Sequence, residues 1–216
     1  MGVSAIFRAL ESRKQQRIFS AALTEFSKEG YAGASLNSIV KKIGISKGSL
    51  FNYFFDKHGL FLFVFEQALE MVKDYLRRVR DETASDDLFT RLEKSLLAGV
   101  AFIRGHPRVY KIYLRVLFES DLPDRNSLIK SIRLLSTEYL TEFLLVAKER
   151  GEIHADVDVR EAVFVVEAVL ERFLQAYGLQ HLDAGSGLYK APEEEVRRWA
   201  RSVISLLRNG LAGSGT

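Results

Sequence analysis

The chain has 216 residues, of which 47% are hydrophobic and 27% are charged, a composition typical of a globular protein that buries a substantial core. It contains no cysteine, which excludes disulfides, thiolate nucleophiles and cysteine-ligated metal sites. The net charge of +3 is unevenly placed, because residues 1–60 carry 9 Lys/Arg against 4 Asp/Glu, whereas residues 61–216 carry 22 against 24. A basic excess at the amino end is what contact with a polyanion such as nucleic acid requires.

The amino end shows no targeting or membrane segment. The longest apolar run, Leu60 to Phe65, is far below the roughly 18 residues that a membrane span needs. No run near the start is long enough for the apolar centre of a signal peptide. We therefore expect a cytoplasmic protein that makes no membrane contact.

Helical periodicity runs through the chain, and no stretch pairs alternating strands with a hairpin turn. The three prolines each lie near the start of a periodic segment, where the missing N–H costs nothing. We therefore predict an all-α fold. Beyond two short helices near the amino end, helices are expected at about 12–29, 56–80, 87–104, 107–119, 123–150, 159–182 and 192–208, followed by a frayed tail, GLAGSGT.

Two short helices follow the first one. The helix at 12–29 stops at Gly30, and Ser35 is then a good N-cap for a helix that Gly44 ends after barely two turns. Ser46 caps a third helix that runs from Lys47 to about residue 53. Two short helices joined by a tight turn that contains glycine are the sequence form of a helix-turn-helix.

The third helix leaves an unusual set of side chains for its outer face. Leu50 and Phe54 lie four residues apart and are expected to face the core, which directs the small, hydroxylated, amide, cationic and aromatic residues outward. That chemistry suits a DNA duplex, since lysine and asparagine bond phosphates or base edges and a ring packs on a thymine methyl. The alternative is the ordinary surface of a small helix, with Phe51 and Tyr53 half buried against the first helix.

The stretch ASLNSIVKKIGISKGSLFNYFFDKHGLF, preceded by RIFSAALTEFSKEGY, resembles the N-terminal DNA-binding domain of TetR-family transcriptional regulators over residues 13–62. The resemblance implies an N-terminal three-helix helix-turn-helix DNA-binding domain, residues 1–58, and a C-terminal helical ligand-binding and dimerisation domain, residues 59–216. It places DNA contacts at Ser35, Asn37, Lys47, Gly48, Ser49, Phe51, Asn52, Tyr53 and Lys57.

Four positions depart from the family pattern. Phe51 replaces the usual tyrosine and so lacks a hydroxyl for a phosphate or base. Phe55 stands where proline or a small residue is common. His58 and Gly59 replace the usual acidic pair after Lys57, which weakens the start of the long helix electrostatically.

The last two long helices indicate a dimer interface. The helix from residue 159 is apolar on more than one face, which is typical of burial from two sides, and the last helix carries a regular apolar stripe. Two such helices from each chain could build a four-helix homodimer interface, as the resemblance also implies, with Val166, Leu170, Val196, Trp199, Val203 and Leu207 in it. The alternative is one monomeric core. A dimer would read two half-sites about 34–36 Å apart and so would bind a palindromic operator of double-stranded DNA.

Aromatic residues are frequent in the middle helices, where they either fill a core or line a cavity. Apolar rings with a few polar handles line the pockets of helical proteins. If a cavity exists, we expect a small, mainly apolar or aromatic effector there. The candidate lining residues are Phe65, Phe102, Tyr110, Tyr113, Phe118, Phe143, Phe164, Phe173 and Tyr177.

Nothing in the sequence points to an enzyme. The four histidines are scattered without metal-binding spacing, and the glycines of AGSGLY lack the preceding strand and the GKS/T ending of a phosphate loop. We expect no catalytic residue, no metal site and no cofactor. The sequence therefore predicts a ligand-responsive transcriptional regulator, a repressor by family resemblance. The alternative is a helical small-molecule carrier or an interaction module without DNA binding.

Overall fold

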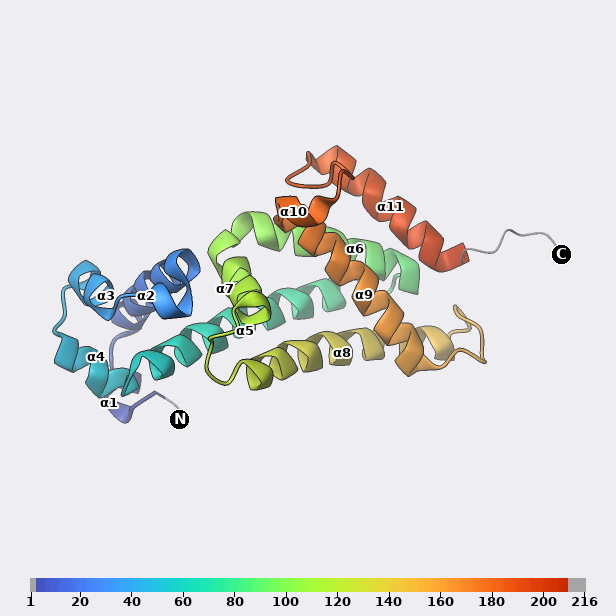
Figure 1. The fold of residues 1–216 in the computed structure, drawn as a ribbon. Helices are drawn as coiled ribbons and strands as arrows, with labels where there is room; N and C mark the ends of the chain where they lie inside the picture. Colours follow the sequence, from blue (N-terminus) through green and yellow to red (C-terminus); the bar gives the residue numbers. More distant parts are fainter. Residues whose placement is uncertain (1–2, 210–216) are drawn as a thin grey trace. The chain divides into compact units, whose positions relative to one another are not determined.

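The computed structural model describes residues 3–209, and in that span the chain consists of helices joined by turns and loops, without strands (Figure 1). The all-α prediction is therefore confirmed. The predicted frayed tail, residues 210–216, lies outside the described residues. The helices are α1 (Ala5–Arg8), α2 (Ser12–Gly33), α3 (Leu36–Ile43), α4 (Lys47–Phe54), α5 (Lys57–Glu82), α6 (Leu88–Gly105), α7 (Pro107–Phe118), α8 (Arg125–Glu149), α9 (Val159–Gly178), α10 (Gln180–Asp183) and α11 (Glu193–Asn209).

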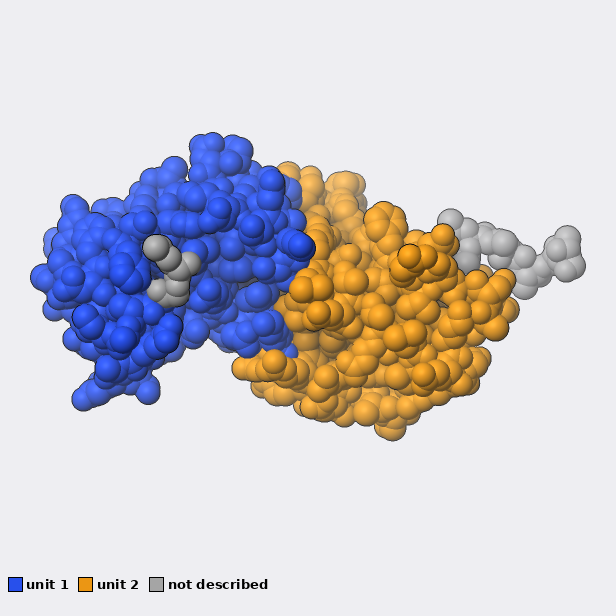
Figure 2. Space-filling view, turned by 90° about the horizontal axis from the view of Figure 1, so that it is seen from below, with its two compact units in different colours: residues 1–73, 106–132 blue, residues 74–105, 133–216 orange. Residues whose placement is uncertain are grey.

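The chain divides into two compact units, shown in different colours in Figure 2. The first unit comprises residues 1–73 and 106–132, and the second comprises residues 74–105 and 133–216. Helices α5 and α8 each contribute residues to both units. This division follows packing and does not coincide with the boundary after residue 58. The functional division into a DNA-binding domain and a ligand-binding domain stays a prediction.

Local capping chemistry sets the ends of the first helices. Gly30 (φ 73°, ψ −179°) breaks α2, so its regular part ends there and one further turn follows. The hydroxyls of Ser35 and Ser46 cap α3 and α4 by accepting the backbone N–H three residues on. Gly44 ends α3 in the left-handed conformation (φ 72°, ψ 39°), which glycine adopts without steric cost. These predicted starts and stops are confirmed.

Helix α1 is absent from the predicted elements. Ser4 caps this single turn, and Phe7, which is only 3% exposed, inserts its ring beside Phe54 and Phe63, at centroid distances of 4.8 and 4.9 Å. Gln15 of α2 donates its side-chain amide to the carbonyls of Phe7 and Arg8 in α1 and of Leu10 just after it, at 3.0–3.3 Å. A buried ring and a capped end therefore tie this short segment to the first unit.

Helix α7 packs along α2 in the first unit, and an ion pair on α7 clasps the end of α2. Arg115 bonds Glu119 at 2.6 Å and donates to the carbonyl of Lys28 at 2.9 Å. Glu119 in turn accepts the backbone N–H of Tyr31 at 3.1 Å. The pair thus satisfies both a carbonyl and an N–H that the end of α2 leaves unpaired. A Cβ at Gly30 would lie 2.3 Å from the Glu119 carboxylate, so the clasp also requires glycine there.

The second unit has a mainly aliphatic core. Helix α6 packs against α9 and α11, and α8 contributes buried side chains to the same hydrophobic cluster. The buried members of the cluster are Leu88, Leu92, Leu140, Phe143, Leu144, Ala147, Val163, Val166 and Ile204. In the span that the structure describes, no helix is long and apolar enough to cross a membrane.

The helix predicted over 159–182 is two helices, α9 and α10. Leu179 lies between them in an extended conformation (φ −128°, ψ 115°), which ends the first helix. The carboxylate of Asp183 then organises the loop that follows, because it accepts the Ser186 hydroxyl and the Leu188 N–H, each at 2.6 Å. The hydrogen bond from Ser186, followed by the backbone N–H groups, lowers the pKa of Asp183. This glycine-rich loop is therefore folded around its own aspartate.

Candidate nucleic-acid interface

Helix α4 is held in place by its cap and by two buried side chains. The Ser46 hydroxyl accepts the N–H of Ser49 at 3.0 Å and lies 2.9 Å from the Ser49 hydroxyl. Leu50 and Phe54 are 2% and 1% exposed, which confirms that this pair faces the core. An eight-residue helix has little stability of its own, so this packing fixes its orientation.

The opposite side of α4 carries exposed side chains of the predicted set. Lys47, Gly48 and Asn52 are exposed, and Phe51 remains 38% exposed, a high value for a phenyl ring. The Lys47 ammonium lies 5.8 Å from the centre of the Phe51 ring, so the cation and the ring occupy one patch. Ser49 is part-buried against its cap. We name Lys47, Gly48, Phe51 and Asn52 the α4 face.

Tyr53 is buried, contrary to its expected outward position. Its side chain is 7% exposed, and its ring lies 6.0 Å from Phe7 and 6.2 Å from Phe54. The physical reason is α1, which packs on α4 and also donates the Ser4 N–H to the Tyr53 carbonyl at 3.0 Å. The short N-terminal helix that the sequence analysis missed therefore covers this ring. Its sequence signal is the serine three residues before an apolar ring, SAIF.

Helix α3 adds two polar positions from the predicted set. Asn37 is exposed in its first turn, and Ser35 is part-buried because its hydroxyl accepts the N–H of Ser38 at 3.3 Å. The backbone N–H of Ser35 donates to the carboxylate of Glu25 at 2.9 Å. A side chain of α2 thus positions the start of α3, and Asn37 is left free to face solvent.

The start of α5 depends on the residues that depart from the family pattern. Asp56 caps the helix by accepting the Gly59 N–H at 2.7 Å. A Cβ at Gly59 would lie only 2.1 Å from the carbonyl oxygen of Phe54, so glycine permits α4 and α5 to meet this closely. Lys57 donates to the Ala32 carbonyl at 2.9 Å. Its ammonium therefore ties the start of α5 to the end of α2, and any DNA contact by Lys57 shares the side chain with this bond.

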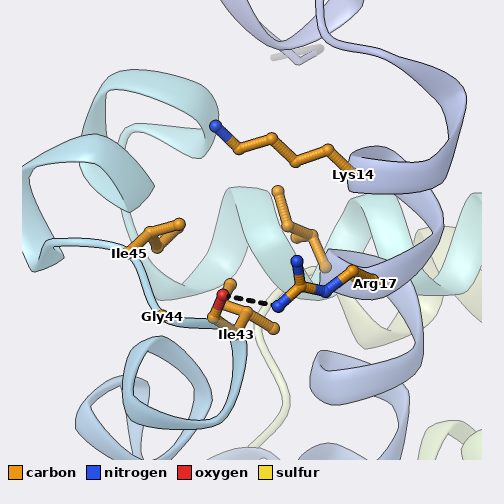
Figure 3. A pocket seen from close by; sticks show the side chains of 6 residues that line it. Lys14, Arg17, Ile43, Gly44 and Ile45 are labelled. Atoms are coloured by element: carbon orange, nitrogen blue, oxygen red, sulfur yellow. Dashed lines mark hydrogen bonds between the residues drawn. The ribbon is translucent and has the colours of Figure 1, made fainter.

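A small pocket lies between α2 and the turn that connects α3 to α4 (Figure 3). Its volume is about 300 Å³, and Lys14, Arg17 and Ile18 line it opposite Gly44 and its two neighbours. Arg17 donates to the carbonyl at the end of α3 at 3.0 Å, whereas the Lys14 side chain extends across the pocket (Figure 3). These two cations beside the helix-turn-helix are absent from the predicted site. Only the basic excess of residues 1–60 indicated them.

The residues predicted to line a ligand cavity fall into both units. Phe65, Tyr110, Tyr113 and Phe118 belong to the first unit, and Phe102, Phe143, Phe164, Phe173 and Tyr177 belong to the second. Phe118 and Phe164 are 59% and 72% exposed, which does not fit an enclosed lining. The Tyr177 hydroxyl, expected to offer the ligand a polar group, already accepts a hydrogen bond from Arg104 at 2.6 Å.

The residues predicted at a dimer interface divide by burial. Val166 and Val196 are 7% and 2% exposed, so they face the core of their own chain and are not free for a partner. The exposed apolar side chains of the same two helices are instead Phe164, Val165 and Leu206, at 72%, 49% and 55%. The other predicted interface residues are part-buried: Leu170, Trp199, Val203 and Leu207.

Comparison with known proteins matches the helix-turn-helix region to a protein family. The model of the bacterial regulatory proteins of the tetR family matches residues 18–64, from α2 to the first part of α5. The uncharacterized HTH-type transcriptional regulator YdgC of Bacillus subtilis is 25% identical over 213 residues, which cover 96% of each chain. The probable acrEF/envCD operon repressor of Escherichia coli is 22% identical over 189 residues, which cover 84% of this chain and 82% of that protein. The chain spans 56% of another Bacillus subtilis relative, the regulator YerO.

A solved structure shares the whole fold. The crystal structure of the transcriptional regulator FadR from Bacillus subtilis in complex with stearoyl-CoA is similar with a TM-score of 0.73, 18% identity, and coverage of 91% of this chain and 99% of that chain. The matched helix-turn-helix domain, the relatives named as transcriptional regulators and the shared fold agree. Residues 18–64 therefore form a helix-turn-helix domain of the tetR family of bacterial regulatory proteins, and the whole chain is similar to relatives named as transcriptional regulators.

Proposed function

We propose that the protein is an effector-responsive repressor that binds a palindromic operator as a homodimer and releases it when a small, mainly apolar effector binds. The observation that carries this proposal is the α4 face, where Lys47, Gly48, Phe51 and Asn52 are exposed on a helix fixed from behind. A cation, an amide, a ring and an approachable backbone supply phosphate contacts and base readout together.

Charge around the α4 face supports contact with DNA. Lys41 and Lys42 are exposed in the last turn of α3, and Lys14 extends across the pocket beside the turn. We propose that Lys14 and one or both of the α3 lysines meet backbone phosphates while α4 enters the major groove. Such phosphate contacts supply sequence-independent affinity and make binding strongly salt-dependent.

Exposed apolar side chains support a homodimer through α9 and α11. Phe164, Val165 and Leu206 are large and exposed in the isolated chain, and removing them from water would stabilise association. We propose that they form the interface with the part-buried Leu170 and Trp199. They replace Val166 and Val196, whose side chains are already buried. A two-fold pair of α4 helices then reads two half-sites of a palindrome.

Repression and release are proposed from the relatives and from the second unit. The Escherichia coli relative is named as a repressor, and the similar FadR structure contains stearoyl-CoA, a molecule with a long apolar chain. We propose that an apolar effector binds in the second unit and shifts α5, which contributes residues to both units. Coupling of this kind is typically about 1 to 3 kcal/mol, enough to change operator affinity roughly 5- to 150-fold.

Selection of bound duplexes from a randomised pool by the purified full chain tests the proposal. The expected result is a palindrome bound with an affinity that falls steeply as salt rises. Lys47→Ala should weaken binding and reduce the salt slope by about 2 per dimer, because each protomer loses about one phosphate contact. Lys28→Ala is the matched control, since Lys28 is exposed on α2 and pairs with Glu29.

Tyr53 requires a milder substitution because it is buried. Tyr53→Phe removes only the hydroxyl and keeps the ring against Phe7. If the hydroxyl reaches a phosphate, affinity should fall while thermal stability stays the same. Selection that enriches no sequence, or binding that Lys47→Ala leaves intact at every salt concentration, would refute the proposed DNA-binding surface.

A further inference from the structure

The core of the second unit contains a small polar cluster between α6 and α8. Arg91 and Ser95 lie one turn apart on α6, and Tyr139 and Phe143 lie one turn apart on α8. The Arg91 guanidinium lies 3.6 Å from the centre of the Phe143 ring, and the Ser95 hydroxyl lies 2.8 Å from that of Tyr139. Two residue pairs with helical spacing thus face each other. We name these four residues the Arg91 cluster.

Arg91 is buried without an ionic partner. It is 5% exposed, its Nε has no hydrogen-bond partner, and no carboxylate of the described residues lies within 4.0 Å of its guanidinium nitrogens. The two nearby carboxylates are engaged elsewhere. Glu142 lies 3.6 Å from Arg80, and Glu152 accepts the Leu88 N–H at 2.6 Å and faces Arg150 at 3.7 Å.

An unpaired buried guanidinium is unfavourable, because arginine stays charged in proteins and loses its hydration when buried. Burial lowers the pKa of Arg91, which reports the same penalty. The Phe143 ring compensates part of it, since its face attracts a cation, but a ring accepts no strong hydrogen bond. The Nε–H of Arg91 therefore has no acceptor among the described residues, and an anion from outside the chain would supply one.

We propose that Arg91 anchors the oxyanion of an amphipathic effector, a carboxylate or phosphate on an otherwise apolar molecule, and that the Tyr139 hydroxyl, which donates to Ser95 in the unliganded chain, turns to donate to the same group. This inference rests on the proposed effector-responsive function and narrows the effector to a chemical class. Leu92, Leu140 and Leu144 belong to the same buried apolar cluster as Phe143. A fixed cation in apolar surroundings selects a molecule with one charged end and an apolar body.

Ligands that share an apolar part test this selection. Decanoate, decyl phosphate and decanol differ in their head group, so binding to the full chain is measured for each by thermal shift and calorimetry. We expect at least one of the two anions to bind at least tenfold more tightly than decanol, and the better one identifies the head group. Equal binding of decanol, or no binding of either anion, would overturn the proposal.

Substitution of Arg91 separates a ligand anchor from a structural residue. Arg91→Met keeps an unbranched apolar side chain and removes the buried charge, so the unliganded variant should be as stable as wild type or more stable. The same variant should lose the preference for the anion, whereas Arg91→Lys should keep part of it. Lys94→Met is the control, because Lys94 is an exposed cation on the same helix and pairs with Asp86. Retention of the full anion preference in Arg91→Met would refute the anchor.

DNA binding distinguishes failure of this inference from failure of the proposed function. Arg91→Met should bind the selected operator like wild type and should not release it with the anion. If wild type binds no operator but still prefers the anion, the repressor function fails and the anion site stands. If wild type binds the operator and discriminates no head group, the repressor function stands and the anion site fails.

Discussion

The two units bury different chemistry. In the first unit, rings interlock at short range: Phe26 meets Phe61 at 5.1 Å, and Phe63 meets both Phe7 and Phe54 at about 5 Å. In the second unit the core is mainly aliphatic, yet it holds three of the four buried polar or charged residues found in the described span, Thr83, Arg91 and Ser95. Edge-to-face rings pack tightly and fix geometry, whereas buried polar groups cost stability unless they are satisfied.

This difference matches what each unit is expected to do. A surface that reads DNA must be held in one position, and a ring cluster behind α4 and α5 achieves this without polar groups. A unit that binds an effector needs polar groups within apolar surroundings, even at a cost in stability. Four kinds of substitution test this difference between the units. They remove one ring, one close approach, one cap or one buried hydrogen bond.

The largest effect is expected from Phe7→Ala in the first unit. Loss of a fully buried ring costs about 3 kcal/mol or more, so the free energy of unfolding should fall by that amount. Ile6→Ala is the matched control, because Ile6 is the preceding residue of α1 and is 58% exposed. It should change stability by less than about 0.5 kcal/mol. Urea unfolding measures both, and equal losses would mean that α1 does not hold the ring cluster together.

Gly59→Ala should cost about 2 kcal/mol, because the new Cβ would lie 2.1 Å from the Phe54 carbonyl oxygen and would push α5 away from α4. Operator affinity should fall with it, since α4 would lose its support. Gly33→Ala is the control in the same unit, where the nearest atom to an added Cβ is Glu29 Cβ at 3.6 Å, an ordinary contact. A stable Gly59→Ala variant with normal DNA binding would show that the first unit is less rigid than its ring cluster indicates.

Prediction from sequence succeeded where the deciding interactions are local. The caps at Ser35 and Ser46 and the stop at Gly44 involve atoms within one turn, so the helix-turn-helix and its polar face could be predicted. Tyr53 could not be placed, because its burial depends on Phe7 in a segment far away along the chain. The burial of Arg91 against α8 likewise depends on tertiary packing, which helical periodicity does not predict.

A middle-sized effect is expected at Asp87, which caps α6 in the second unit. Its carboxylate accepts the N–H groups of Phe89 and Thr90 at 3.0 and 3.3 Å and pairs with Arg208 at 3.0 Å. Asp87→Ala should therefore cost about 1 kcal/mol at neutral pH. Asp87→Asn keeps the cap and should lose only a few tenths of a kcal/mol, about the worth of an exposed charge beside a helix start.

The pH dependence of this effect follows from the sign of the shift. The hydrogen bond from Thr90, more than any other contact, lowers the pKa of the Asp87 carboxyl in the folded chain. The carboxylate therefore stabilises the fold at pH values above the ordinary pKa of aspartate, and this contribution is lost as pH falls through the lowered folded pKa. The stability gap between wild type and Asp87→Ala should narrow on acidification. A gap that stays constant down to acid unfolding would exclude the ionised cap.

The smallest effect is expected from Tyr139→Phe in the Arg91 cluster. The change removes the Ser95 to Tyr139 hydrogen bond, but Ser95 keeps its bond to the Arg91 carbonyl at 2.7 Å, so the loss should be about 0.5 to 1 kcal/mol. Tyr75→Phe is the control, because the contacts of Tyr75 involve its ring. If Tyr139→Phe destabilised the chain as strongly as Phe7→Ala, the second unit would depend on its buried polar groups as the first depends on its rings. Those groups would then be structural, and the contrast between a rigid support for DNA reading and a core that retains polar groups for a ligand would disappear.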